Sequence, residues 1–149
     1  MIVDSSSLIS LSRTGLLDVI GLLPEPPRIL DVVWREVVDE GLAGQHADAS
    51  AIDAALRSEP RQAAPVAPTI DQAVLLSAVA DGTLLANDLA LGRRARNLGA
   101  RWIRTADLIV ILQRTGRYTA NHARNAIAAL WSAGRITKSL RDQYLEALR

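Results

Sequence analysis

Residues 1–10, MIVDSSSLIS, decide the fold that this sequence predicts. Met1, Ile2 and Val3 form a short apolar run with two β-branched residues, which is typical of a buried strand. The run ends at Asp4, and three serines then lead into the apolar residues of a helix. The first strand therefore ends at a carboxylate. The carboxyl ends of strands form the edge where open α/β sheets bind their ligands.

The same pattern recurs in the second half of the chain. Residues 83–86, TLLA, predict a second buried strand, which ends at Asn87 and Asp88 before a helix. Residues 101–104 predict a third strand, and a helix again follows it. Helices that alternate with strands in this way predict a mostly parallel sheet covered on both faces, that is, a three-layer α/β/α fold.

The remaining elements are short. They are predicted as a helix over 14–24, a strand over 28–30, a helix over 32–40, a helix over 49–56, an exposed connection with three prolines over 58–68, a helix over 69–81 and two helices within 118–149. The last two helices form a C-terminal helical hairpin packed on the body. We expect a single domain over 1–149, because two smaller domains would bury too little core.

Composition excludes several classes of protein. Cysteine is absent, so disulfides and thiolate metal sites are excluded, and the two histidines, His46 and His122, disfavour a zinc site. No apolar run reaches membrane-spanning length, and no basic segment precedes the first apolar run. We therefore expect a cytoplasmic protein that does not bind a membrane. Any metal would be a hard cation with oxygen ligands.

Charge is distributed unevenly along the chain. Residues 1–75 contain 5 basic and 11 acidic side chains, whereas residues 76–149 contain 12 basic and 5 acidic ones. An acidic half and a basic half of the chain can form the two sides of one site, in which carboxylates hold cations and arginines bind phosphates. Ordinary surface charge and an acidic partner protein are alternative explanations.

Several acids are predicted at one edge of the sheet, after strands or near helix starts. They are Asp4, Glu36, Asp71, Asp88 and Asp107. Capping explains any one of them, but it does not explain why two continuous apolar strands both end at an acid. Converging carboxylates repel one another unless a cation binds them, and Mg²⁺ or Mn²⁺ suits an all-carboxylate site. The pattern therefore favours metal-assisted hydrolysis of phosphodiester bonds.

The order of four motifs resembles that of the PIN-domain nucleases, within them the toxin-like group related to VapC. The motifs are IVDSSSLI, VVWREVV, TIDQAVLLSAVADGTLLAND and LALGRRARNLGARWIRT. The closing stretch, IAALWSAGRITKSLRDQYLEAL, resembles the helical hairpin of one PIN subgroup. The resemblance covers nearly the whole chain. It implies a Mg²⁺- or Mn²⁺-dependent endoribonuclease acting on RNA, often the toxin of a type II toxin–antitoxin pair, which forms homodimers and is silenced by an antitoxin protein.

The resemblance also assigns roles to individual residues. Asp4, Asp71 and Asp88 would hold the metal, and Glu36 would share their site or position the attacking water. Ser6 matches the small hydroxyl residue that supports the first acid. Asp71 matches its family position less closely, because its spacing from Asp88 is shorter than in the family.

Other residues are candidates for supporting roles. Asn87 stands where many relatives have a further acid, which would weaken a second metal position. Asp107 is an outside candidate, because relatives often have a small residue there. The helix after the TLLA strand carries three arginines that are either phosphate contacts or plain solvated charge, namely Arg93, Arg94 and Arg96.

Two other functions stay open. In the first, Asn87 and the displaced Asp71 mark a lost metal site, and the chain is a non-catalytic PIN-like module that binds RNA or protein. In the second, the same acids serve a structure-specific DNA nuclease. Aromatic residues make up only 3% of the chain, so we expect recognition of the nucleic-acid backbone and shape rather than extensive base stacking.

Overall fold

The computed structural model describes residues 1–148, which form a mixed α/β fold with a small parallel sheet. Strands β1 (Ile2–Val3), β4 (Thr83–Leu85) and β5 (Arg101–Ile103) pair in that order, and both pairs are parallel. The predicted parallel pairing is therefore confirmed. All three carboxyl ends lie at the same edge, because parallel strands point the same way.

Two further strands extend this arrangement beside β1. Strands β2 (Ile29–Leu30) and β3 (Arg61–Gln62) pair in parallel, and a parallel bridge joins Ile2 to Arg28. Strand β3 lies inside the segment predicted as an exposed connection. Its Arg-Gln pair has none of the apolar character that predicts a strand, so the sequence did not reveal it.

Helices account for most of the remaining residues. Their bounds are α1 (Ser5–Arg13), the 3₁₀ helix η1 (Leu17–Leu22), α2 (Asp31–Trp34), the π-helical turn η2 (Arg35–Asp39), α3 (Glu40–Ala43), α4 (Ala47–Leu56), α5 (Ile70–Asp81), α6 (Leu89–Asn97), α7 (Thr105–Arg114), α8 (Ala120–Ser132) and α9 (Lys138–Ala147). The single helix predicted over 32–40 is thus a longer helical run with a π-helical turn in its middle.

Local signals explain where several helices begin and end. The Thr69 hydroxyl accepts a hydrogen bond from the backbone N–H of Gln72, which caps α5. Gly82 ends that helix with a positive φ of 96°, a conformation that glycine adopts without strain. Thr137 caps α9 in the same way as Thr69 caps α5, through the N–H of Leu140.

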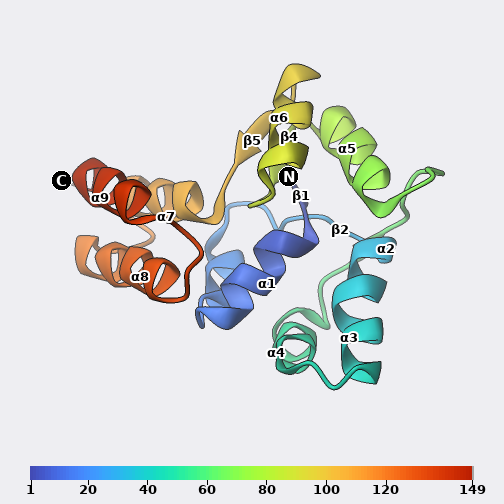
Figure 1. The fold of residues 1–149 in the computed structure, drawn as a ribbon, viewed down its shortest axis with the longest axis horizontal. Coiled ribbons are helices and arrows are strands. Elements are labelled where there is room, and N and C mark those ends of the chain that lie inside the picture. The colour runs from blue at the N-terminus through green and yellow to red at the C-terminus, as the bar shows by residue number, and fades with distance from the viewer. Residues whose placement is uncertain (149) are drawn as a thin grey trace.

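The core is built on the apolar strands. Ile2, Val3, Leu84 and Leu85 are fully buried, as a parallel sheet covered by helices requires. Helices α7, α8 and α9 lie together at one end of the long axis, and α2, α3 and α5 lie toward the other, with α1 between them (Figure 1). In the C-terminal helices, Leu130 is fully buried, whereas Trp131 is 41% exposed.

None of the helices in residues 1–148 has the length and apolar character needed to cross a bilayer. The longest, α8, has 13 residues, whereas a spanning helix needs about 20 predominantly apolar residues. This agrees with the apolar run lengths in the sequence.

Candidate functional site

Asp4 is a buried acid at the edge of the sheet where the strands have their carboxyl ends. It directly follows β1 and caps α1 in an extended conformation, and only 5% of it is exposed. Its Oδ2 accepts hydrogen bonds from the Ser6 hydroxyl at 2.7 Å and from the Ser6 backbone N–H at 3.2 Å. The apolar strand and the serine-rich helix start therefore hold this carboxylate in one orientation, as the first ten residues predict.

A hydrogen-bond network links Asp4 to the ends of the neighbouring strands. The Ser6 hydroxyl, which donates to Asp4, also accepts from the Asn87 backbone N–H at 3.0 Å. The Asn87 side chain then bonds to Thr105 after β5: its Nδ2 donates to Thr105 Oγ1 at 3.0 Å and its Oδ1 accepts from the Thr105 N–H at 3.1 Å. Asn87 thus joins the ends of β4 and β5.

Electrostatics at this edge disfavour the ionised form of Asp4. Burial raises the pKa of the Asp4 carboxyl above its ordinary value of 3.8, hydrogen bonds from Ser6 and Ser5 lower it, and the charge of Asp71 raises it further. Asp71 lies exposed in the first turn of α5 and is close enough to act on Asp4 through its charge. A nearby cation would favour the ionised form of Asp4.

Glu36 reaches the same region from the π-helical turn η2. Its side chain is exposed, and its Oε2 accepts a hydrogen bond from the Ser5 hydroxyl. Ser5 directly follows Asp4 in the chain. The fold therefore brings Glu36 to the start of α1, next to Asp4. Sequence reasoning did not single out Ser5, and its place in the triple serine was the available signal.

Asp88 lies at the same edge, after β4, and its best-defined role is structural. Its Oδ1 accepts from the Leu91 N–H at 2.8 Å and caps α6, while the side chain is exposed to solvent. We call Asp4, Glu36, Asp71 and Asp88 together the acidic edge. Three of these four are exposed, so their side chains have freedom to change rotamer.

Asp107 is not part of the acidic edge, and its contacts are structural. Its Oδ2 accepts from the Arg104 N–H at 2.8 Å, and its Oδ1 accepts from the Tyr144 hydroxyl at 2.8 Å. Both oxygens thus have partners in the fold, one at the start of α7 and one in α9. Partial burial and the hydrogen bond to Asp107 raise the pKa of Tyr144, so its phenol stays protonated.

The three predicted arginines lie on the outer face of α6. Arg93, Arg94 and Arg96 are all exposed, while Leu91 and Ala95 of the same helix are buried. The guanidinium carbon of Arg96 lies 6.0 Å from the ring centroid of Trp102. Arg96 is therefore within cation–π range of Trp102, an aromatic residue of β5 that was not predicted from the sequence to be part of a site.

The acidic edge fits a hard cation by the chemistry of its donors, which are carboxylate oxygens. As the side chains are placed here, however, residues 1–148 contain no group of three or more Asp, Glu or His side chains positioned to bind a metal ion.

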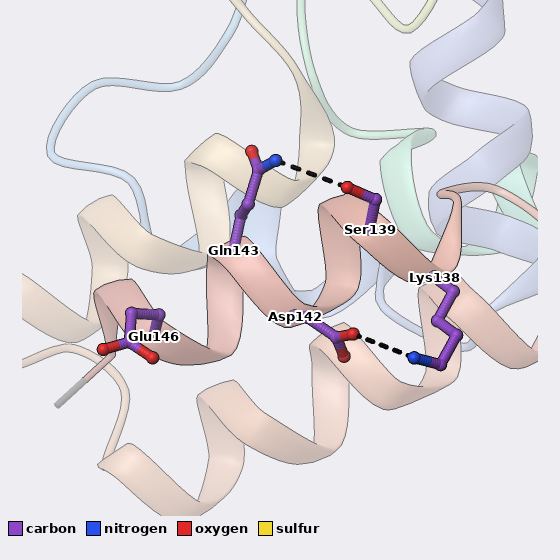
Figure 2. Close-up of a pocket in the computed structure, with 5 residues that line it drawn as sticks. All are labelled: Lys138, Ser139, Asp142, Gln143 and Glu146. Atoms are coloured by element: carbon purple, nitrogen blue, oxygen red, sulfur yellow. Dashed lines mark hydrogen bonds and ion pairs between the residues drawn. The ribbon is translucent and has the colours of Figure 1, made fainter.

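A separate hollow of about 540 Å³ lies on α9 (Figure 2). Its side chains all come from that helix, where Lys138 bonds to Asp142 and Gln143 bonds to Ser139. Both pairs are spaced i, i+4, as expected on a solvated helix face. This hollow shares no residue with the acidic edge, and a single helix face gives no enclosed site.

Comparison of the chain with protein-family models, with curated proteins and with solved structures found no match. A given fold also supports many activities, so functional assignment depends on the side chains of a site and their geometry. The candidate side chains in this chain are those of the acidic edge and the residues bonded to it or to one another there, Ser5, Ser6, Asn87 and Thr105.

Proposed function

We propose that the protein is a Mg²⁺- or Mn²⁺-dependent endoribonuclease that hydrolyses RNA phosphodiester bonds. One observation carries the proposal: a buried carboxylate, Asp4, ends β1 at the carboxyl edge of a parallel sheet, with Glu36 bonded to the adjacent Ser5 and Asp71 within reach of its charge. Placing unpaired carboxylates together costs free energy, because burial and like charge both oppose ionisation. Such an arrangement is typical of a site that functions with a cation.

The residues of the acidic edge would have different roles. Asp4, Asp71 and Asp88 would hold the cation, with Ser6 orienting Asp4. Glu36 would share the site or position the attacking water. When bound, the cation supplies charge neutralisation at the phosphate and a water of lowered pKa.

The proposal extends to the finer architecture. We place the chain in the PIN-like class: one domain with three layers, in which the parallel sheet is the middle layer and helices α8 and α9 form a C-terminal hairpin. The parallel order of β1, β4 and β5 and the packing of α8 on α9 are compatible with this arrangement.

A toxin role follows from the same resemblance. In a type II toxin–antitoxin pair, an antitoxin would cover the acidic edge with a basic side chain, and the toxin would form homodimers. Expression of the chain alone should then arrest growth, and expression of the Asp4→Asn variant should not. Co-expression of the protein encoded by the neighbouring reading frame should relieve the arrest.

A second candidate is a non-catalytic PIN-like module that binds RNA or protein. Two observations favour it: the Asn87 side chain is occupied by Thr105, and Asp88 caps α6. A third candidate, a structure-specific DNA nuclease, would use the same acidic edge. Metal binding and oligonucleotide cleavage separate these candidates.

Metal binding is tested by thermal unfolding in EDTA and in MgCl₂ or MnCl₂. At ten times the dissociation constant, binding to the native state adds about 1.4 kcal/mol, or a Tm increase of about 3–6 °C for a chain of this size. Asp4→Asn should abolish the increase. Asp53→Asn, which removes a half-buried acid of α4 that pairs with Arg57, should retain it. An equal increase in all three proteins would contradict a site at Asp4.

Catalysis is tested with matched oligonucleotides. Endonucleolytic cleavage of RNA, and not of DNA of the same sequence, is expected in Mg²⁺ or Mn²⁺ and should be lost in EDTA and in Asp4→Asn. Cleavage of the DNA instead would indicate the DNA nuclease. Binding without cleavage of either would indicate the non-catalytic module.

A further inference from the structure

A basic and aromatic groove lies between β5 and α9. Two adjoining hollows form it, one of about 410 Å³ and one of about 420 Å³. Both are lined by Trp102 and Tyr144. We call this surface the arginine groove, after the four arginines that line one hollow or the other, namely Arg96, Arg101, Arg104 and Arg114.

The charge of the arginine groove is strongly positive. Four arginines face a single acid, Asp107, whose two oxygens already accept from the Arg104 N–H and from Tyr144. Arg96, Arg101 and Arg114 are exposed, so they are accessible to a ligand. Several cations along one groove suit a ligand with several anionic groups in a row.

Trp102 contacts two of the four arginines of the groove. Its ring lies 4.6 Å from the guanidinium carbon of Arg104 and 6.0 Å from that of Arg96, both within cation–π range. The indole is itself fixed, because its Nε1 donates to the Ala86 carbonyl at 2.9 Å. Guanidinium groups held in this way are preorganised for phosphate oxygens.

The groove also has apolar walls. The indole of Trp102 and the phenol ring of Tyr144 are half-buried, and Val110, Ile111 and Leu140 lie along the two hollows. Gly92 and Arg104 already lie against the Trp102 ring, so the exposed part of Tyr144 and the aliphatic side chains are the surfaces on which unpaired bases, which a duplex hides, would pack. Phosphate contacts together with stacking surfaces favour a single-stranded nucleic acid over an acidic peptide.

The groove and the acidic edge are joined within the fold by a hydrogen-bond network that passes through buried Thr105. Arg104 precedes Thr105, whose N–H and hydroxyl bond to Asn87, and the Asn87 N–H bonds to Ser6, the partner of Asp4. Resting on the function proposed above, we infer that the arginine groove binds single-stranded RNA and directs it across the end of β5 toward Asp4. This assigns a substrate class that the acidic edge alone does not specify.

The inference is tested by binding, which requires no cleavage. Fluorescence anisotropy is measured in EDTA with a labelled single-stranded RNA of roughly 12 nucleotides, over a series of salt concentrations. The double variant Arg101→Gln/Arg114→Gln should bind about 10-fold more weakly, and its slope of log K against log salt should fall by about 1.4, the value for two phosphate contacts on a single strand. Both side chains are exposed, so the fold should survive.

A charge-matched control is Arg35→Gln/Arg124→Gln, which removes two exposed arginines outside the groove. It should retain the salt slope and lose no more than about twofold in affinity. Equal losses in both double variants would overturn the inference. Equal affinity for duplex RNA, or displacement of the RNA by polyglutamate at the same charge concentration, would overturn it as well.

The outcome is separable from that of the proposed function. Groove-dependent binding without any metal-dependent cleavage would refute the nuclease and leave the groove established. Cleavage of RNA that is unaffected by the Arg101→Gln/Arg114→Gln variant would establish the nuclease and refute the groove as its substrate path.

Discussion

The Ser6 hydroxyl donates a 2.7 Å hydrogen bond to Oδ2 of Asp4 while it accepts one from the backbone N–H of Asn87. One small side chain therefore supports the buried acid and joins the ends of β1 and β4. Replacing Ser6 with alanine would leave the Asn87 N–H without this acceptor and Asp4 without this donor. A cost of about 1–3 kcal/mol in the free energy of unfolding is expected, since both groups are partly buried.

The Ser6→Ala variant is compared with the native chain by urea denaturation. The matched control is Ser132→Ala, at the exposed end of α8, which should change stability by less than about 0.5 kcal/mol. Because the lost bond favours ionised Asp4, the pKa of Asp4 should also rise in Ser6→Ala. NMR titration of the Asp4 carboxyl carbon measures it. An unchanged pKa would show that the Ser6 hydroxyl does not act on this acid.

The raised pKa of Asp4 predicts a stabilising substitution. Above the unfolded value of 3.8 the unfolded state loses its proton first, so this group reduces stability as pH rises from 3.8 through the folded pKa. Asp4→Asn removes the buried charge and its repulsion by Asp71. The variant should therefore be more stable than the native chain at pH 7 in EDTA, on the order of 1 kcal/mol, because a neutral amide costs less to bury than a carboxylate.

Urea denaturation of both proteins between pH 3.5 and pH 8 checks this prediction. The advantage of Asp4→Asn should shrink toward acidic pH, where Asp4 is protonated in the native state. Asp53→Asn is the control for the opposite direction, because the hydrogen bond from Arg57 lowers the pKa of Asp53. Loss of the Asp53 carboxylate should therefore destabilise the fold slightly at pH 7. An Asp4→Asn variant that is less stable throughout would mean that capping of α1 outweighs the burial of charge.

The strands and their terminal acids were predictable from the sequence for a physical reason. A run such as TLLA is apolar throughout because both faces of a parallel strand are covered, and it ends where the chain returns to solvent at Asp88. The caps Thr69 and Thr137 were predictable because capping is local, within three residues of the helix start.

Contacts between distant segments were not predictable in this way. Strand β3 forms because Arg61 and Gln62 pair with an apolar strand, and nothing in their own side chains indicates pairing. The hydrogen bond from Tyr144 to Asp107 joins residues 37 positions apart, so it depends on how α9 packs on α7. The arginine groove likewise needs β5, α7 and α9 in place before its residues share a surface.

The Tyr144 hydroxyl is expected to stabilise the packing of α9. It donates at 2.8 Å to Oδ1 of Asp107, a charged acceptor, so Tyr144→Phe should lower the free energy of unfolding by about 1–2 kcal/mol. Burial and this hydrogen bond raise the pKa of Tyr144 above its ordinary value of 10.0. The unfolded state therefore loses the proton first, and native stability should fall as pH rises above 10.

Chemical denaturation at pH 7 measures the loss of stability in Tyr144→Phe, and denaturation across alkaline pH measures the fall in native stability. The fall above pH 10 should be smaller in Tyr144→Phe, and it should not vanish, because burial raises the pKa of Tyr118 as well. Tyr118→Phe is the matched control and retains the bond to Asp107. If Tyr144→Phe left stability at pH 7 unchanged, the contact between α7 and α9 would not depend on this bond.

Gly92 is expected to be essential for the position of Trp102. A Cβ on this buried residue of α6 would lie 2.0 Å from Cε2 of the indole, so Trp102 would have to move and give up its bond to the Ala86 carbonyl. Gly92→Ala should therefore destabilise the fold by about 1–3 kcal/mol, even though alanine is intrinsically favoured in helices by about 1 kcal/mol.

Because Trp102 contacts Arg104, the Gly92→Ala variant should also bind single-stranded RNA more weakly than the native chain at a temperature where both are folded. Gly21→Ala, where a Cβ meets no atom within 4 Å, should change neither quantity appreciably. A Gly92→Ala variant with native stability and native RNA affinity would show that the indole does not need the space that this glycine leaves.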